Sequence, residues 1–269
     1  MAFALAPGRP LREALRQAAI AECERALEHL QRGESADIHE TRKSIKRLRA
    51  WLRLLKPALG DRYGTLDRLL RDAGRALAGR RDRDVARATL RSLRRGRLLS
   101  AAQYAALLPQ LDALAPTDTP RAEADTDATH LLRAAAVYLR SLELPEMDVH
   151  SLTEALARNR RRCRRRWRDA RARPTAEALH GWRKSVKHLA TQSALLAPLL
   201  PDAAGDVTAL KDLGETLGLH HDHHQLGLQL HADELPDTGL LRLRLHDALR
   251  TRLRQLEQRA LRQGKRLFN

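Results

Sequence analysis

Residues 38–48 read IHETRKSIKRL, and residues 179–189 read LHGWRKSVKHL. The two segments share a His, an Arg-Lys-Ser triplet and a later Lys at the same steps, with apolar residues at equivalent places. His180 follows His39 by 141 positions. Self-similarity at a fixed offset indicates a structural unit that occurs twice in the chain.

A second pair of matching segments follows the first. Residues 71–77 read RDAGRAL and residues 211–217 read KDLGETL, at an offset of 140. Two pairs in the same order, at nearly the same separation, predict a tandem duplication. We expect a single domain over residues 8–267, with a first helical bundle over 8–144 and a second over 146–267.

The composition predicts an all-α protein. The apolar fraction is 43%, enough for a core, and consists mostly of Leu and Ala. Leu, Ala and Arg favour helices, whereas aromatic residues, which favour strands, make up only 3% of the chain. Gly and Pro residues mark the breaks between helices. The predicted helices span residues 10–31, 35–56, 61–79, 83–95, 100–114, 122–142, 148–172, 175–197, 202–218, 220–233 and 238–266.

The charge balance indicates a polyanionic partner. Lys and Arg number 50 against 33 acidic residues, for a formal net charge of +17. Such an excess repels itself in a compact protein, so a binding partner of opposite charge is expected. Arg supplies a planar fork of N–H donors that matches pairs of phosphate oxygens.

The repeated motif places its basic residues on one side of a helix. At 100° per residue, one face is apolar and is expected to pack into a core. That apolar face consists of Ile38, Ile45, Leu48, Leu52 and Leu55. Beside it runs a cationic stripe with spacings of three, four, three and four residues. The stripe consists of His39, Arg42, Lys46, Arg49 and Arg53.

The second copy keeps the first part of this stripe as His180, Arg183 and Lys187, and then changes to Ala190 and Ala194. A merely solvated face would not require the same His, Arg and Lys at the same steps in both halves. The stripe is therefore interpreted as a phosphate-binding surface. A His near its ordinary pKa would be partly charged at neutral pH, so binding is expected to weaken as the pH rises.

At these residues the sequence resembles the CHAD domain, the conserved-histidine α-helical domain. The family motif is a His followed three residues later by Arg, with further basic residues at about seven, eight and ten. His39, Arg42, Lys46, Arg47 and Arg49 match this motif. The second copy matches through His180, Arg183 and Lys187, and the resemblance extends over nearly the whole chain.

The resemblance implies two helical bundles related by a pseudo-twofold axis, with the basic stripes lining a central cavity. It also implies binding of inorganic polyphosphate, association with polyphosphate granules and no catalysis. The chain departs from the family pattern at Ala190, and at His221 where the first half has Arg81. The polyphosphate-binding residues expected on this basis are His39, Arg42, Lys43, Lys46, Arg49, Arg53, Arg71, Arg81, His180, Arg183, Lys187 and Lys211.

A nucleic-acid-binding protein is the main alternative. The charge suits it, and residues 158–173 form a dense basic helix. However, the sequence has no helix-turn-helix or zinc-finger spacing, and aromatic residues for base stacking are scarce. Trp51, Trp167 and Trp182 have apolar neighbours at helical spacing, which predicts packing in a core.

A metal-dependent phosphohydrolase is a second alternative, suggested by residues 220–224, which read HHDHH. A metal site needs several ligands that converge. On a helix Asp222 lies away from the face shared by His220 with His223 or His224, so we interpret the run as surface histidines. No catalytic residue, metal or cofactor is predicted.

The sequence predicts a cytoplasmic protein that does not insert into membranes. Two cysteines, Cys23 and Cys163, make no disulfide framework, and the amino terminus does not resemble a signal peptide. No apolar stretch is long enough to span a bilayer. Binding to a membrane surface is also disfavoured, because residues 148–172 carry few large apolar side chains opposite their charge.

Overall fold

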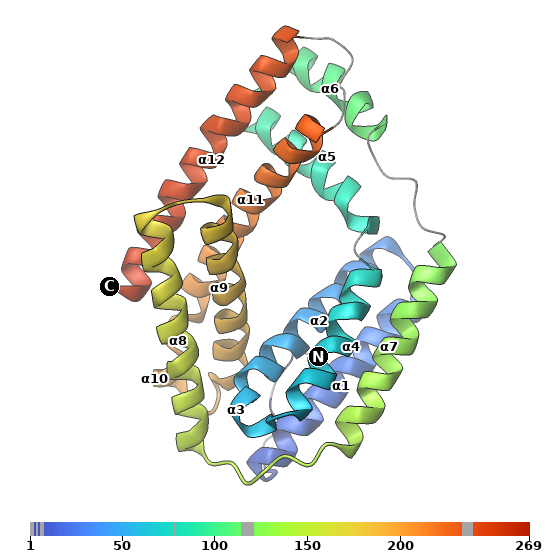
Figure 1. Ribbon diagram of the computed structural model, residues 1–269, viewed down its shortest axis with the longest axis vertical. Helices are drawn as coiled ribbons and strands as arrows, with labels where there is room; N and C mark the ends of the chain where they lie inside the picture. Colours follow the sequence, from blue (N-terminus) through green and yellow to red (C-terminus); the bar gives the residue numbers. More distant parts are fainter. Residues whose placement is uncertain (1–2, 4, 6–7, 78, 114–120, 233–238) are drawn as a thin grey trace. The chain divides into compact units, whose positions relative to one another are not determined.

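The computed structural model describes residues 3, 5, 8–77, 79–113, 121–232 and 239–269. For Ser35 and for residues 79–83, 113, 121–123 and 231–232, it describes the backbone alone. These parts of the chain contain helices and no strands, which confirms the all-α prediction (Figure 1). The helices are α1 (Leu11–Arg32), α2 (Ser35–Leu54), α3 (Lys56–Leu59), α4 (Arg62–Ala76), α5 (Gly79–Arg95), α6 (Ala101–Ala113), α7 (Arg121–Ser141), α8 (Val149–Ala172), α9 (Ala176–Leu196), α10 (Pro201–Ala204), α11 (Val207–Ala232) and α12 (Gly239–Phe268).

Proline and glycine set two helix ends that differ from the prediction. The helix expected to reach residue 56 ends at Leu54, because Pro57 has no N–H to continue the helical hydrogen bonds and its ring clashes with the preceding turn. Pro57 lies instead in the first turn of the short α3. The helix expected from residue 202 is instead α10 followed by α11. Gly205 separates them with a φ of 63°, which glycine adopts without strain.

The predicted break between residues 218 and 220 is wrong. α11 runs without interruption from Val207 to Ala232, and Gly218 is buried inside it. A glycine within a helix costs only about 1 kcal/mol relative to alanine, so packing of the helix on its neighbours is enough to keep it helical.

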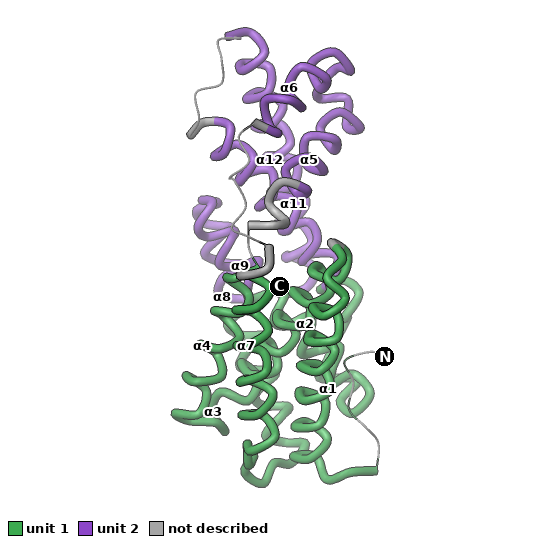
Figure 2. The backbone as a smooth tube through the Cα atoms, turned by 90° about the vertical axis from the view of Figure 1, so that its right-hand side faces the viewer, with its two compact units in different colours: residues 1–78, 119–163, 185–210 green, residues 79–118, 164–184, 211–269 purple. Residues whose placement is uncertain are grey.

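The described chain forms two compact units (Figure 2). Unit 1 comprises residues 1–78, 119–163 and 185–210, and unit 2 comprises residues 79–118, 164–184 and 211–269. Each unit takes segments from both sides of the expected seam between the repeats. The helices α8, α9 and α11 each contribute residues to both units.

Unit 1 is built on four long helices. α1 packs against α2 and α7, and α4 packs against the same two helices. The predicted apolar face of α2 is buried as expected, including Ile38, Ile45 and Leu48. Next to this core the carboxylate of Glu22 is fully buried and pairs with Arg25 and Arg47. Paired in this way, a buried carboxylate avoids the large desolvation cost of an isolated charge.

Unit 2 has two apolar centres. One joins α5, α6, α11 and α12 through buried leucines such as Leu90, Leu107, Leu226 and Leu249. In the other, Trp167 and Trp182 lie against Gly264 of α12. Both indoles are buried, as is that of Trp51 in unit 1, which confirms their predicted packing role.

Gly264→Ala is expected to destabilise the protein by about 1–3 kcal/mol, because the site has no room for a methyl group. A Cβ at this position would lie 2.6 Å from Trp167 Cδ1 and 2.7 Å from Trp182 Cζ2. Urea denaturation measures the loss. Gly64→Ala is the matched control, since a Cβ there meets nothing within 4 Å. Equal stability of the two variants would contradict the packing described.

Both cysteines are buried free thiols, and burial raises the pKa of Cys23 to about 12. Cys23 is therefore a small packing residue and not a reactive thiol. In the part of the chain that the structure describes, no helix is long and apolar enough to cross a membrane.

Candidate functional site

The Arg of the repeated motif has a structural partner in unit 1. Arg42 is half-buried on α2, and its Nη1 donates to the backbone carbonyls of Gly74, at 3.3 Å, and Leu77. These carbonyls lie at the end of α4, where the helix dipole favours a positive charge. Arg42 therefore ties α2 to the end of α4, whatever else it binds.

Arg42→Ala is expected to lower the free energy of unfolding by about 1–3 kcal/mol, since it leaves two part-buried carbonyl groups at the end of α4 without this donor. Lys46→Ala, on an exposed residue one helical turn later, should change the stability by less than about 0.5 kcal/mol. Thermal or urea denaturation of the two variants checks this. If the Arg42→Ala protein were as stable as the Lys46→Ala protein, the hydrogen bonds from Arg42 to the end of α4 would contribute nothing to the stability.

Other predicted binding residues pair with acids of their own unit. Lys43 Nζ lies 2.7 Å from Glu40 Oε1, on the flank of α2. Arg71 on α4 is exposed and lies 3.4 Å from Asp72. Such exposed pairs contribute little to stability and exchange partners at small cost.

The far end of the stripe meets basic residues of other helices in unit 1. Arg49 and Arg53 of α2 act electrostatically on His188 of α9, together with Arg162 of α8. We call these four residues the Arg cluster. Asp67 of α4 faces them, and its Oδ1 accepts a bond of 3.1 Å from Arg49 Nε. Arg49 and Arg53 have one carboxylate partner between them among the described residues, Asp67, so this pair keeps an excess of positive charge.

His188 is half-buried among the residues of the Arg cluster. Burial, followed by the charges of Arg53 and Arg49, lowers the pKa of His188 to about 3, although Asp67 raises it. The imidazole is therefore neutral at neutral pH. Strongly lowered pKa values of this kind are typical of functional sites. Positive charges around the imidazole contribute to the lowering, and the same charges would attract an anion.

The positive charge of Arg53 has little compensation from its surroundings. Among the described residues it has no carboxylate partner, and its polar contact is with the hydroxyl of Tyr63 at 3.5 Å. Its Nε is buried without a hydrogen-bond acceptor in the same part of the chain. A half-buried cation held in this way is costly for the folded protein, and an incoming anion would relieve the cost.

The motif histidine of the second copy lies in unit 2. The His180 ring stacks on His221 of α11, with 4.6 Å between ring centroids. Arg183, Lys184 and His224 act electrostatically on this pair, and we call the five residues the His cluster. Burial is the largest cause of the lowered pKa of His180, and it lowers the pKa of His221 to about 4.

Both rings are therefore mainly neutral at neutral pH, which corrects the expectation of a partly charged motif histidine for His180. A neutral imidazole still donates one N–H bond and accepts another. The Nδ1 atom of His180 is buried and has no hydrogen-bond partner among the described residues.

The interpretation of residues 220–224 as surface histidines is wrong for two of them. His220 and His223 are buried, and His223 Nδ1 lies 2.7 Å from the Leu219 carbonyl while its Nε2 lies 2.9 Å from Ser92 Oγ. His223 thus links α11 to α5 inside unit 2. Within the described ranges, no group of three or more His, Cys, Asp or Glu side chains is arranged to hold a metal ion.

The remaining predicted residues are distributed over both units. His39 is half-buried on α2, while Lys46, Lys187 and Lys211 are exposed on their helices. Arg81 is on α5, and its side chain lies outside the described residues.

Sequence reasoning did not assign a binding role to Arg162, Lys184, His188, His221 or His224. One signal was available for His188, because it occupies the position of Arg47 in the repeated motif.

Three comparisons place the chain among known proteins. The family model of the CHAD domain matches residues 14–231. No curated protein matches the chain in sequence. Among solved structures, PptA from Streptomyces chartreusis is similar, with a TM-score of 0.66 at 17% sequence identity, over 96% of this chain and 100% of that one.

At this identity the structural similarity concerns the fold alone. The family match is independent of it and extends over both copies of the motif, from α1 to α11. It includes the His-x-x-Arg of each copy, at residues 39–42 and 180–183. The chain therefore belongs to the CHAD domain family.

Proposed function

We propose that this protein binds inorganic polyphosphate, with the Arg cluster as a principal contact. The observation that carries the proposal is Arg53, a half-buried guanidinium without a carboxylate partner among the described residues, close to Arg49, Arg162 and a neutral His188. A polyanion would supply the missing negative charge. Membership of the CHAD family supports polyphosphate as that polyanion.

Phosphate suits the donors of the Arg cluster. A guanidinium presents two parallel N–H groups to two oxygens of one phosphate, and charge-assisted bonds of this kind are roughly twice as strong as neutral ones. Polyphosphate carries a negative charge on every unit and has no bases. Its recognition then depends on charge density and on fixed donors, and the helices α2, α8 and α9 fix these donors.

The His cluster is proposed as a second contact. Its exposed Lys184 and half-buried Arg183 supply charge, and the Nδ1 of His180 supplies a polar atom without a hydrogen-bond partner in the described part of the chain. α9 carries residues of both clusters. The resemblance to the CHAD domain family suggests a binding role on polyphosphate granules, without catalysis.

Arg53→Met tests the proposal directly. Removing an uncompensated cation should leave the free energy of unfolding unchanged or raise it, whereas polyphosphate affinity should fall by about 10-fold or more. Isothermal titration with long-chain polyphosphate gives the affinity, and urea denaturation gives the stability.

Arg68→Met is the matched control, because Arg68 is exposed on α4 and outside both clusters. It should leave both quantities nearly unchanged. If Arg53→Met destabilised the protein and left its affinity intact, Arg53 would be a structural residue and the proposal would fail.

A further inference from the structure

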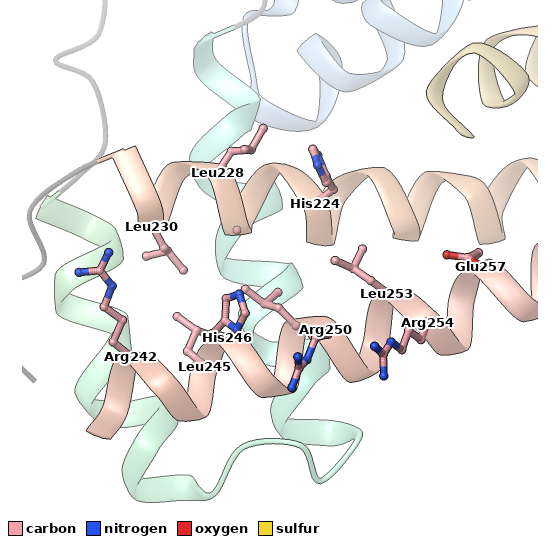
Figure 3. A pocket seen from close by; sticks show the side chains of 12 residues that line it. His224, Leu228, Leu230, Arg242, Leu245, His246, Arg250, Leu253, Arg254 and Glu257 are labelled. Atoms are coloured by element: carbon pink, nitrogen blue, oxygen red, sulfur yellow. The ribbon is translucent and has the colours of Figure 1, made fainter. Parts of the chain in front are cut away.

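A pocket in unit 2 shares one lining residue, His224, with the two cationic clusters. It lies between α11 and α12, and its volume is about 320 Å³. Figure 3 shows Leu230 of α11 and Leu245 and Leu253 of α12 pointing into the space between the two helices. Gly227 also lines it, and the missing side chain leaves room over Leu249.

One side of this pocket is a regular row of basic residues. Arg242, His246, Arg250 and Arg254 line it at intervals of four residues along α12. Four residues of helix rise by about 6 Å, so the row presents an N–H donor side chain at that interval over about 18 Å, and three of its four members are Arg. Arg250 pairs with Asp247 at 3.2 Å, but both side chains are exposed, and such pairs are readily exchanged.

One acid closes the row. Glu257 lines the pocket after Arg254, and its partial burial raises its pKa, which Arg254 counteracts. The pocket thus has a positive flank that ends in a carboxyl group. Leu228 at its edge is 50% exposed, and Leu243, on the same side of α12 as Arg250 and Arg254, is 64% exposed. Large apolar side chains exposed beside an apolar pocket are typical of protein-binding surfaces.

We propose that this α11–α12 groove binds an acidic amphipathic helix of a partner protein. Apolar residues of such a helix at intervals of three and four would fill the leucine-lined space. Acidic residues four apart on its flank rise by the same interval of about 6 Å as the basic row, so their carboxylates meet the three arginines and the N–H donor of His246 in turn. A lipid with a single head group would use only one of these four positions, which favours a helix.

Glu257 determines which end of the partner helix lies at which end of the groove. The acids of the partner face Arg242 to Arg254, and a Lys or Arg near one end of the partner faces Glu257. The span from Arg242 to Glu257 is about 22 Å, which corresponds to a partner helix of about 16 residues.

A labelled synthetic peptide tests the proposal on the full chain. The probe has about 16 residues, with Leu at helical spacing, Glu at every fourth position beside the leucines, and a terminal Lys. Fluorescence anisotropy at about 150 mM salt is expected to show saturable binding. A peptide of the same composition in scrambled order should bind at least about 10-fold more weakly.

Two double variants of equal net charge distinguish binding in the groove from attraction of the acidic peptide to the positive charge of the whole protein. Arg250→Glu with Arg254→Glu should weaken peptide binding by about 10-fold or more. Arg259→Glu with Arg262→Glu changes exposed residues of α12 outside the groove and should have less than about a twofold effect. Thermal denaturation verifies that both variants are folded.

Three results would overturn the proposal. The ordered peptide could fail to bind, or the two double variants could bind it equally, which would indicate attraction to net charge alone. In the third result, phosphatidylglycerol vesicles bind the wild-type protein but not the variant Arg250→Glu with Arg254→Glu, and the peptide does not bind. That third result would assign the groove to a membrane surface.

Discussion

Replacing Arg49, Arg53 and Arg162 together by Gln is expected to weaken the binding of long-chain polyphosphate by about 1,000-fold at physiological salt. Each guanidinium is proposed to make charge-assisted hydrogen bonds to phosphate, worth about 1.5 kcal/mol or more. The three act electrostatically on the same residue, His188, so they lie close enough to contact one stretch of polyphosphate together. Isothermal titration calorimetry measures the affinity of the folded variant.

The matched control replaces Arg68, Arg133 and Arg259 by Gln. These residues are exposed and lie outside both cationic clusters, and the change in net charge is the same. Long-range attraction to a polyanion should then fall equally in both variants, so the difference between them isolates the Arg cluster. If the two variants lost the same affinity, binding would depend on net charge and the Arg cluster would have no special role.

The folded protein is expected to lose stability as the pH falls below about 6.5. Burial lowers the pKa of His188 to about 3 and that of His220 and His221 to about 4. Between the ordinary value of 6.5 and these lowered values, the unfolded chain binds protons that the folded protein does not. The contribution is thus complete above pH 6.5 and is lost as the pH falls, by up to about 1.4 kcal/mol per pH unit for His188 and for His220, and by less for the more exposed His221.

Urea denaturation between about pH 7.5 and pH 5 measures this dependence in a range where most carboxylates stay charged. His188→Gln should reduce the slope, whereas His150→Gln should not, because His150 is exposed. A slope unchanged by His188→Gln would show that His188 is not held neutral. Bound polyphosphate should favour the protonated form of His188. The affinity of the protein for polyphosphate should therefore rise as the pH falls.

The repeated motif was sufficient to predict much of the fold. The apolar face of α2 is buried, and the stripe beside it reaches the Arg cluster through Arg49 and Arg53. Local chemistry explains the helix ends that were predicted well, such as the end of α1 at Gly33, which has a φ of 72°. The continuous α11 was not predicted, because a buried glycine in a helix depends on tertiary packing that periodicity does not reveal.

The candidate site was only partly predictable for a related reason. Helical spacing identifies residues that share a face, but not the residues of other helices that pack against it. Arg162 and His188 reach the Arg cluster from α8 and α9. Spacing also cannot reveal that Arg42 is occupied with the carbonyls at the end of α4. The buried His223, bonded to Ser92, similarly required the tertiary structure.

Binding of nucleic acid is the main rival to the proposed function. Single-stranded nucleic acid is usually bound by stacking its bases on exposed aromatic residues. Trp51, Trp167 and Trp182 are all buried, so none of the three is available for stacking. The cationic clusters can attract any polyanion, but fixed guanidinium groups favour the one with the highest density of phosphate charge.

Competition between polyanions tests the central claim most directly. Labelled long-chain polyphosphate is bound to the protein at physiological salt, and unlabelled duplex DNA or RNA is added in excess, counted in phosphate units. The proposed function predicts that polyphosphate stays bound and that only unlabelled polyphosphate displaces it. If nucleic acid displaced the label as well as unlabelled polyphosphate does at the same concentration of phosphate units, the proposed function would be contradicted. The protein would then be a general binder of polyanions.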